Sequence, residues 1–200
     1  KGLEVEKLKS LNAPVTIAIL ADDPNASARA LEYNAAGFEV IVMASDDRND
    51  ALNGAKNSGQ IKNALDVMFN NIPNAIGLLD SAQGNIQKKS RVAATLVDSF
   101  VESGHGLITY AKGLNSVDRE ASAAGVRTAK VARTLDANNE NKAVITRYLD
   151  RVALDAGRDG AAIVLGTTAK GTVAALAGWV LSSKGQSVAL APASAVLLGQ

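Results

Sequence analysis

The side chains that could do chemistry lie just after short apolar segments. Aspartates stand at three such places, as Asp22-Asp23, Asp46-Asp47 and Asp80. Ligands of parallel α/β proteins bind at the carboxyl ends of the strands. Five carboxylates on one rim could therefore hold a hard cation or act as acid and base. Asp, Ser and Thr at such places also cap the next helix or shape its loop, and we favour this second interpretation.

The remaining rim candidates follow the third, fourth and sixth apolar segments. The sequence alone assigns a catalytic role to none of these residues. The candidate cleft-rim residues are Asp80, Ser81, Lys112, Asn115, Thr167 and Thr168.

Cysteine is absent and histidine occurs once, which excludes several kinds of site. Disulfides, thiolate catalysis, Cys-rich zinc sites and zinc sites with three histidines cannot form. The single histidine, His105, lies in Ser103-Gly104-His105-Gly106, a helix-to-strand turn. This turn belongs at the amino-terminal end of a strand, opposite the usual site, so we predict a turn or surface histidine.

The sequence carries no established nucleotide or phosphate motif. No Gly-x-Gly-x-x-Gly follows a predicted strand, and no Gly-Lys-Ser/Thr phosphate loop occurs. The segment from Gly166 to Thr172 could present backbone N–H groups to an anion. A helix cap is the interpretation that we favour for it.

These residues must be positioned by strands and helices that alternate along the whole chain. The apolar strands predict a sheet covered on both faces, and the helices show a 3.6-residue period. Such alternation indicates a parallel sheet with crossover helices, as a β/α barrel or a doubly wound sheet. The polar stretch 44–58 is expected to be an exposed connection. The predicted strands are 15–20, 39–43, 75–79, 106–110, 127–131, 162–165 and 187–191, and the predicted helices are 3–11, 25–36, 61–69, 92–101, 117–124, 144–152 and 173–181.

Length and composition set the class of protein. Two hundred residues, 47% of them hydrophobic, predict one globular domain over 1–200. A net charge of +1 argues against a nucleic-acid partner bound through a basic surface. No apolar run reaches the ~18 residues that span a bilayer. Three Phe, three Tyr and one Trp provide few rings for stacking on sugars or bases.

The amino-acid sequences of the segments, and their order along the chain, resemble those of the divergent polysaccharide deacetylases of bacterial envelopes. For example, Ala35-Ala36-Gly37-Phe38-Glu39-Val40 resembles the family's Ala-x-x-Gly-His-Glu-Val, and Ile72-Pro73-Asn74-Ala75-Ile76-Gly77 resembles its Val-Pro-x-Ala-Val-Gly. No single segment is specific, but eight occur in order. The other similar segments begin at Pro14, Gly104, Gly125, Leu135, Ala162 and Leu190.

The resemblance implies a distorted β/α barrel of the metal-dependent carbohydrate esterase kind. Active relatives are thought to hold a divalent metal with one Asp and two His and to hydrolyse N-acetyl groups of sugars. The metal would polarise the carbonyl group and activate a water molecule.

The chain departs from this family where the chemistry would take place. Ser81 stands where the family's Asn-Asn-His-Met-Gly-Ser has its histidine, and Thr167 stands at the histidine of Gly-His-Pro. Phe38 replaces the histidine of the Gly-His-Glu segment. The family's first strand, which ends in an Asp-Asp pair, would precede Lys1. Neutral hydroxyls rarely replace imidazoles as zinc ligands.

We therefore expect a degenerate homologue, without metal or other cofactor, that binds a glycan or an envelope protein. The alternative is an active carbohydrate N-deacetylase with a rearranged site, in which Asp80 or another rim carboxylate would help to hold zinc or another divalent metal. A third hypothesis is a purely structural protein that binds a partner. Because the resemblance is to exported proteins, we expect a periplasmic or envelope location through a signal or anchor upstream of Lys1.

Overall fold

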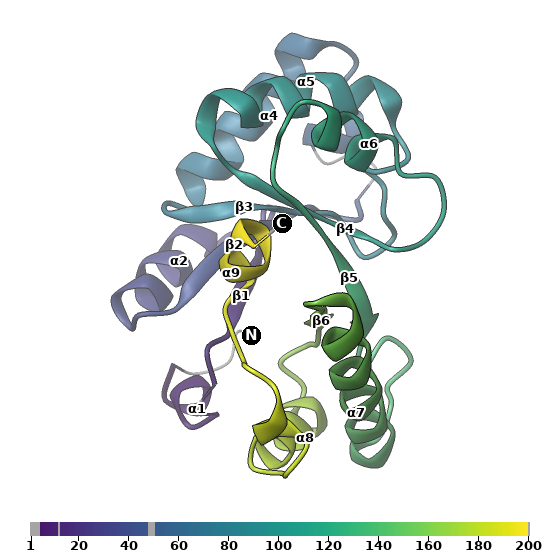
Figure 1. Cartoon of the computed structure of the whole chain (residues 1–200). Coiled ribbons are helices and arrows are strands. Elements are labelled where there is room, and N and C mark those ends of the chain that lie inside the picture. The colour runs from purple at the N-terminus through teal and green to yellow at the C-terminus, as the bar shows by residue number, and fades with distance from the viewer. Residues whose placement is uncertain (1–4, 12, 48–50, 200) are drawn as a thin grey trace. The chain divides into compact units, whose positions relative to one another are not determined.

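The computed structural model describes residues 5–11, 13–47 and 51–199 (Figure 1). The chain divides into two compact units. We call Thr16–Ala129 with Leu197–Gln200 the large unit, and Lys1–Val15 with Lys130–Val196 the small unit. The first predicted helix and the loop 44–58 both extend into residues outside the described part, at positions 3–4 and 48–50.

The large unit is built from parallel strands joined by helices. Neighbouring strands pair in the order of the chain, β1 with β2, β2 with β3 and β3 with β4. The helix α3 lies inside the stretch for which we expected only a connection. The elements are β1 (Thr16–Leu20), α2 (Ala26–Ala35), β2 (Glu39–Met43), α3 (Ala51–Gly54), α4 (Ser58–Asn71), β3 (Ala75–Leu79), α5 (Ser90–Ser103), β4 (Gly106–Tyr110) and α6 (Ser116–Ala123).

Two glycines allow β3 and β4 to approach each other. Gly77 pairs with Gly106 in the register of these strands. A Cβ atom on Gly77 would overlap the main chain of Gly106, and one on Gly106 would lie 2.6 Å from Leu197 Cδ1. Only glycine fits at position 77, whereas a side chain at position 106 would require the end of the Leu197 side chain to shift. The carboxyl ends of β3 and β4 carry four of the rim residues that the sequence predicts as a candidate site.

The small unit packs two helices around a separate apolar core. Its elements are α1 (Val5–Lys9), most of β5 (Thr128–Thr134), α7 (Lys142–Asp159), β6 (Ile163–Leu165), α8 (Lys170–Val180) and the short helix η1 (Gly185–Ser187). The helix α9 (Ala193–Leu198) begins in this unit and ends in the large unit. β5 and β6 pair in parallel. The buried core residues are Leu135, Ile145, Leu149, Ala175, Trp179 and Val180.

The predicted α/β fold of the distorted (β/α) barrel type is confirmed. The strand order β1-β2-β3-β4-β5-β6 follows the chain without inversion, whereas a doubly wound sheet reverses its order at a switch point. The described residues form six strands instead of about seven. None of the described helices is long and apolar enough to cross a membrane.

The prediction of a strand at 187–191 is wrong. Ser187 ends the short helix η1, and no strand follows it in the described residues up to 199. Val188 and Leu190 instead pack their side chains against the core of the small unit. The segment is apolar because its side chains pack against this core, and it pairs with no strand of the described residues.

Candidate functional site

Asp80, directly after β3, is a buried carboxylate that shapes its own loop. Its exposed fraction is 0%. One carboxylate oxygen accepts the backbone N–H of Ser81 (2.7 Å) and Ile86 (3.0 Å), and the other accepts that of Gln87 (2.8 Å). Burial raises the pKa of Asp80, although these N–H groups and the charge of Lys88 oppose the shift. Asp80 therefore fixes the segment 81–87 to the end of β3.

Gln87 joins this loop to the end of β4, and the sequence analysis missed it. Its side chain is fully buried. Its Oε1 accepts the backbone N–H of Tyr110 at 2.9 Å, and its Nε2 donates to the carbonyl oxygen of Lys112 at 2.6 Å. Nothing in the local sequence marks this glutamine, because its partners lie 23 and 25 residues away.

Lys112 and Asn115 stand on the loop after β4 and have different roles. Lys112 is exposed, donates to the Ala82 carbonyl oxygen at 3.3 Å, and holds its ammonium 5.2 Å from the centre of the Tyr110 ring. The Asn115 side chain accepts the Asp118 N–H at 2.9 Å, which caps α6. Asn115, a rim candidate in the sequence, therefore serves as a helix cap.

Ser81, at the position of a family histidine, is buried and faces its own turn. Its hydroxyl oxygen accepts the backbone N–H of Asn85 at 3.1 Å. The structure thus brings Asp80, Ser81, Lys112 and Asn115 together at the ends of β3 and β4, as the rim prediction implies. The first two stabilise the loop and the fourth caps a helix, so Lys112 is the one with an exposed functional group.

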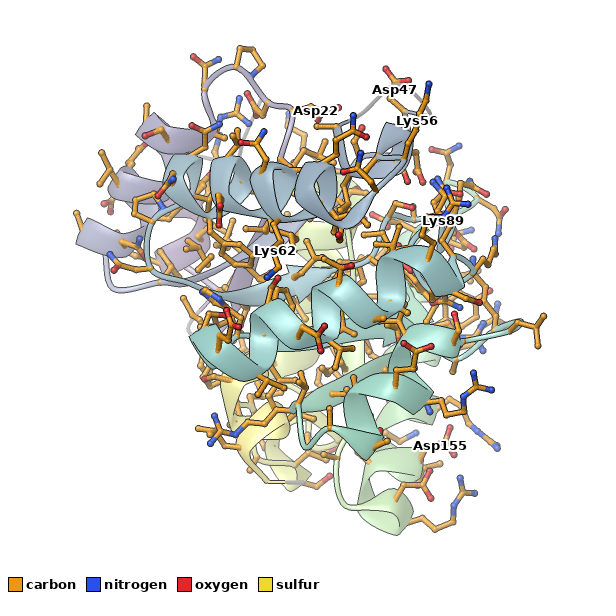
Figure 2. All side chains as sticks on the ribbon, turned by 90° about the horizontal axis from the view of Figure 1, so that it is seen from above. Asp22, Asp47, Lys56, Lys62, Lys89 and Asp155 are labelled. Carbon is orange, nitrogen blue, oxygen red and sulfur yellow. The ribbon has the colours of Figure 1, made fainter. Side chains whose placement is uncertain are left out.

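The aspartates after β1 and β2 also stabilise loops through hydrogen bonds and an ion pair. The Ser45 hydroxyl donates to Asp22 at 2.5 Å. Asp23 accepts the backbone N–H of Asn25 at 2.9 Å, and the Arg29 guanidinium lies 2.6 Å from it. Asp46 accepts the backbone N–H of Gln83 at 3.0 Å. Figure 2 shows Asp22 and Asp47 on one side of the large unit, where these strands end.

The remaining candidates, Thr167 and Thr168, lie in the small unit. Asp136 accepts hydrogen bonds from the Thr167 backbone N–H (3.0 Å), the Thr167 hydroxyl (2.5 Å) and the Thr172 hydroxyl (2.5 Å). Burial acts to raise the pKa of Asp136, but these hydrogen bonds outweigh it and hold the pKa below its ordinary value. Thr168 is exposed.

The expected cap of α8 is not formed by a side chain at its first position. Ala169 occupies the N-cap and has no side chain that can accept a hydrogen bond. Thr167 instead accepts the Ala169 N–H at 3.3 Å and so shapes the turn before the helix. The hydroxyl groups of Thr167 and Thr172, which lie in the segment that we expected to cap the helix, instead donate hydrogen bonds to the Asp136 carboxylate.

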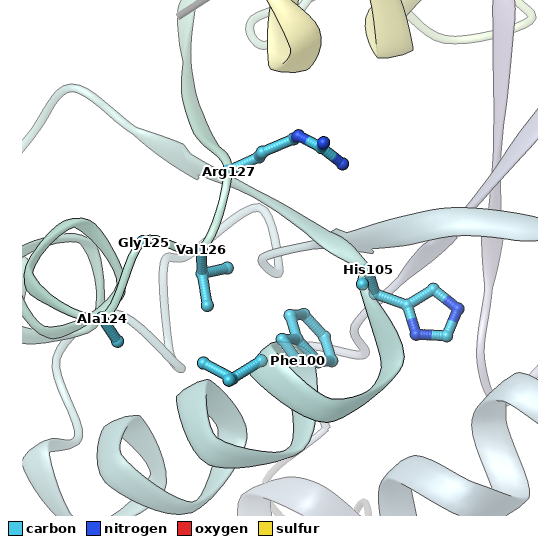
Figure 3. Close-up of a pocket in the computed structure, with 8 residues that line it drawn as sticks. Phe100, His105, Ala124, Gly125, Val126 and Arg127 are labelled. Atoms are coloured by element: carbon cyan, nitrogen blue, oxygen red, sulfur yellow. The ribbon is translucent and has the colours of Figure 1, made fainter.

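His105 lies before the first residue of β4, at the amino-terminal end, as predicted. Its ring stacks on Phe69 with centroids 4.0 Å apart, and its Nδ1 lies 2.8 Å from the Ser103 hydroxyl. Burial lowers the pKa of His105. The ring lines a pocket of about 240 Å³ together with residues of α5 and of the segment 124–127 between α6 and β5 (Figure 3).

Tyr110, the last residue of β4, carries an unusual hydroxyl. It is buried and has no hydrogen-bond partner in the described part of the chain. Burial and the nearby carboxylates of Asp80 and Asp46 raise the pKa of Tyr110 to about 12. A buried phenol without a partner loses the hydrogen bonds that it makes with water in the unfolded chain.

The residues present do not fit the metal that the resemblance implies. Both carboxylate oxygens of Asp80 are occupied by backbone N–H groups, and Ser81 offers a hydroxyl that faces Asn85. Over residues 5–11, 13–47 and 51–199, no three His, Cys, Asp or Glu side chains are grouped so that they could hold a metal ion. A catalytic zinc needs three protein ligands and an open position.

Comparison with known proteins assigns the scaffold. Residues 1–197 match the family model of the divergent polysaccharide deacetylases. A crystal structure of an uncharacterized protein from Agrobacterium tumefaciens superposes with a TM-score of 0.83 at 17% identity, over 98% of this chain and 84% of the other. No curated protein matches the sequence. At this identity the likeness to the solved structure shows the fold alone.

Proposed function

Since the chain belongs to the divergent polysaccharide deacetylase family, we propose that it is a non-catalytic member that binds a glycan. The observation that carries the non-catalytic part of this proposal is the state of Asp80, whose carboxylate accepts three backbone N–H groups and is fully buried. Asp80 precedes Ser81, which stands at the position of a family histidine, and each carboxylate oxygen of Asp80 already accepts at least one backbone N–H that holds the loop. The glycan part of the proposal rests on the family.

The energetics of hydrolysis support the same proposal. Water bound to a catalytic zinc has a pKa of about 7, against about 15.7 for bulk water. Without that metal, general-base catalysis by a rim carboxylate contributes roughly 10²–10⁴-fold. Enzymes commonly provide about 10⁶-fold or more. Ser81 and Thr167 supply hydroxyl groups that already take part in other hydrogen bonds.

The alternative is an active N-deacetylase with a rearranged site. It would use the aspartates of the family's first strand together with Asp80 or another rim carboxylate around a metal ion. The experiment is an assay of acetate release from acetylated chitooligosaccharides and peptidoglycan, with the full-length protein loaded in turn with zinc, cobalt and manganese. We expect no turnover above background. Turnover that a chelator or the Asp80→Ala substitution abolishes would contradict our proposal and support the alternative.

We also propose an envelope location, which follows from the family's association with exported proteins. The test is fractionation of cells that express the full-length protein at its natural level. Recovery with periplasmic or membrane markers is expected, and recovery with cytoplasmic markers alone would overturn this part of the proposal.

A further inference from the structure

Two lysines from different loops meet at one turn of the large unit. Lys88, on the loop after β3, donates to the Gln83 carbonyl oxygen at 2.6 Å. Lys112, on the loop after β4, donates to the neighbouring Ala82 carbonyl oxygen at 3.3 Å. Both lysines are exposed. We call Ala82, Gln83, Lys88 and Lys112 the lysine turn.

Both ammonium groups keep unused hydrogen-bonding capacity. Neither forms an ion pair with a carboxylate among the residues that the structure describes. An ammonium has three N–H donors, and one main-chain carbonyl occupies only one of them. The carbonyl group orients the ammonium group but does not neutralise its positive charge. The lysine turn therefore presents two positioned cations to solvent.

The surroundings favour an acceptor-rich ligand over a donor-rich one. Lys112 is held over the ring of Tyr110, where attraction between the cation and the ring favours its position. Two carboxylates near the turn already accept hydrogen bonds. Asp46 is exposed and accepts the Gln83 N–H through one oxygen, and Asp80 is fully buried with three N–H partners.

Neutral sugars are commonly held by stacking on exposed aromatic rings, which this protein does not offer. All seven Phe, Tyr and Trp residues lie in the described part of the chain, and each is buried or half-buried. Recognition at this rim must therefore rely on hydrogen bonds and charge.

We propose that the lysine turn is a subsite for the carboxylate or phosphate group of an acidic oligosaccharide. This inference rests on the proposed glycan-binding function and adds the chemical class of the glycan. Charge-assisted hydrogen bonds from an ammonium group to an anionic group are stronger than neutral ones. Because the lysines are exposed, the attraction is expected to weaken as the ionic strength rises.

The experiment measures binding by calorimetry with the full chain. The probes are a trisaccharide of a hexuronic acid, the neutral chitin trisaccharide and inorganic phosphate. The variants are Lys88→Gln and Lys112→Gln, with Lys62→Gln as the matched control. Lys62 is an exposed lysine of the same unit and lies on α4, whereas the lysine turn is formed by the loops after β3 and β4. A thermal melt of each variant verifies folding.

We expect the uronic acid trisaccharide to bind at least about 10-fold more tightly than the neutral one. Each lysine-turn variant should weaken that binding about 10-fold, and Lys62→Gln should leave it unchanged. Equal binding of both sugars, or uronate binding that the lysine-turn variants do not change, overturns the inference but leaves the proposed function. No binding of either sugar overturns both. Phosphate that binds as tightly as the uronate shows a free-anion site and overturns the glycan assignment.

Discussion

At the scale of single residues, the hydrogen bonds of each carboxylate decide its role. Asp80 and Asp136 both follow strands, and both are surrounded by donors. Residue type alone would make either of them a candidate acid or metal ligand. Their occupied oxygen atoms make them structural instead, and substitutions at these positions should change stability.

Asp80→Asn should destabilise the large unit. The amide keeps one acceptor oxygen but turns its NH₂ group toward a backbone N–H, so at least one buried hydrogen bond is lost. We expect a loss of about 1–3 kcal/mol in the free energy of unfolding, measured by urea titration. Asp66→Asn, at an exposed position of α4, is the control. Equal stability of Asp80→Asn and the unsubstituted protein would show that the three N–H bonds do not hold the loop.

Tyr110→Phe should leave stability unchanged or raise it. The substitution removes a buried hydroxyl that has no hydrogen-bond partner and keeps the ring. We expect a gain of up to about 1 kcal/mol, because the cost of desolvating the hydroxyl disappears. A urea titration measures the change. A clear loss of stability would mean that the hydroxyl has a partner in solution, such as a bound water.

Asp136 should make stability depend on pH in the acid range. Hydrogen bonds from Thr167 and Thr172 hold its folded pKa below the ordinary value of 3.8, in spite of its partial burial. A group with a depressed folded pKa stabilises the fold above its unfolded pKa and loses that contribution as the pH falls. We expect unfolding curves of the unsubstituted protein and Asp136→Asn to differ most above about pH 4 and to converge below it. A difference that grows on acidification would contradict this assignment.

At the scale of elements, the strand ends depend on how closely the strands approach. The parallel pair β3 and β4 is brought together by Gly77 and Gly106, and their carboxyl ends support the lysine turn. Several helices are fixed locally by asparagine caps, for example by Asn57 at the start of α4 and Asn141 at the start of α7.

Gly77→Ala should be strongly destabilising. The added Cβ would overlap the main chain of Gly106, which cannot move without breaking strand pairing. We expect a loss of about 1–3 kcal/mol in the free energy of unfolding. Gly59→Ala is the control, because its Cβ would meet its nearest neighbour at an ordinary 3.4 Å. Comparable thermal melts of the two variants would show that β3 and β4 tolerate a wider separation.

At the scale of the whole molecule, the protein has the fold of its family, but its described side chains do not form the metal site that the family resemblance implies. The family model extends over residues 1–197, and a solved structure with 17% identity has the same fold. A backbone of this kind is compatible with very different residues at its strand ends, so fold and activity are separable.

The full-length protein should carry no stoichiometric zinc. The described side chains offer no group of three or more His, Cys, Asp and Glu placed to hold a metal ion. Elemental analysis after purification without chelators should find well under one zinc per chain. One tightly bound zinc per chain, retained through dialysis, would show that residues outside the described ranges or a rearranged rim complete a metal site.

The sequence alone predicted six of the strands and the family. Buried parallel strands are apolar on both faces, so β2, β3 and β4 were predicted with their observed bounds. The turn position of His105 followed from the same local pattern. The strand at 187–191 failed because an apolar run does not distinguish strand pairing from packing of Val188 and Leu190 on a core.

Only the tertiary structure decided what the rim residues do. Gln87 meets Tyr110 across 23 residues, Lys112 meets Ala82 across 30, and Thr167 meets Asp136 across 31. Hydrogen bonds over such separations leave no periodic trace in the sequence, because each depends on where two loops end in space. The sequence could therefore place polar residues at the strand ends, but it could not show that Asp80 accepts three backbone N–H groups and that two lysines bind neighbouring carbonyl groups of one turn.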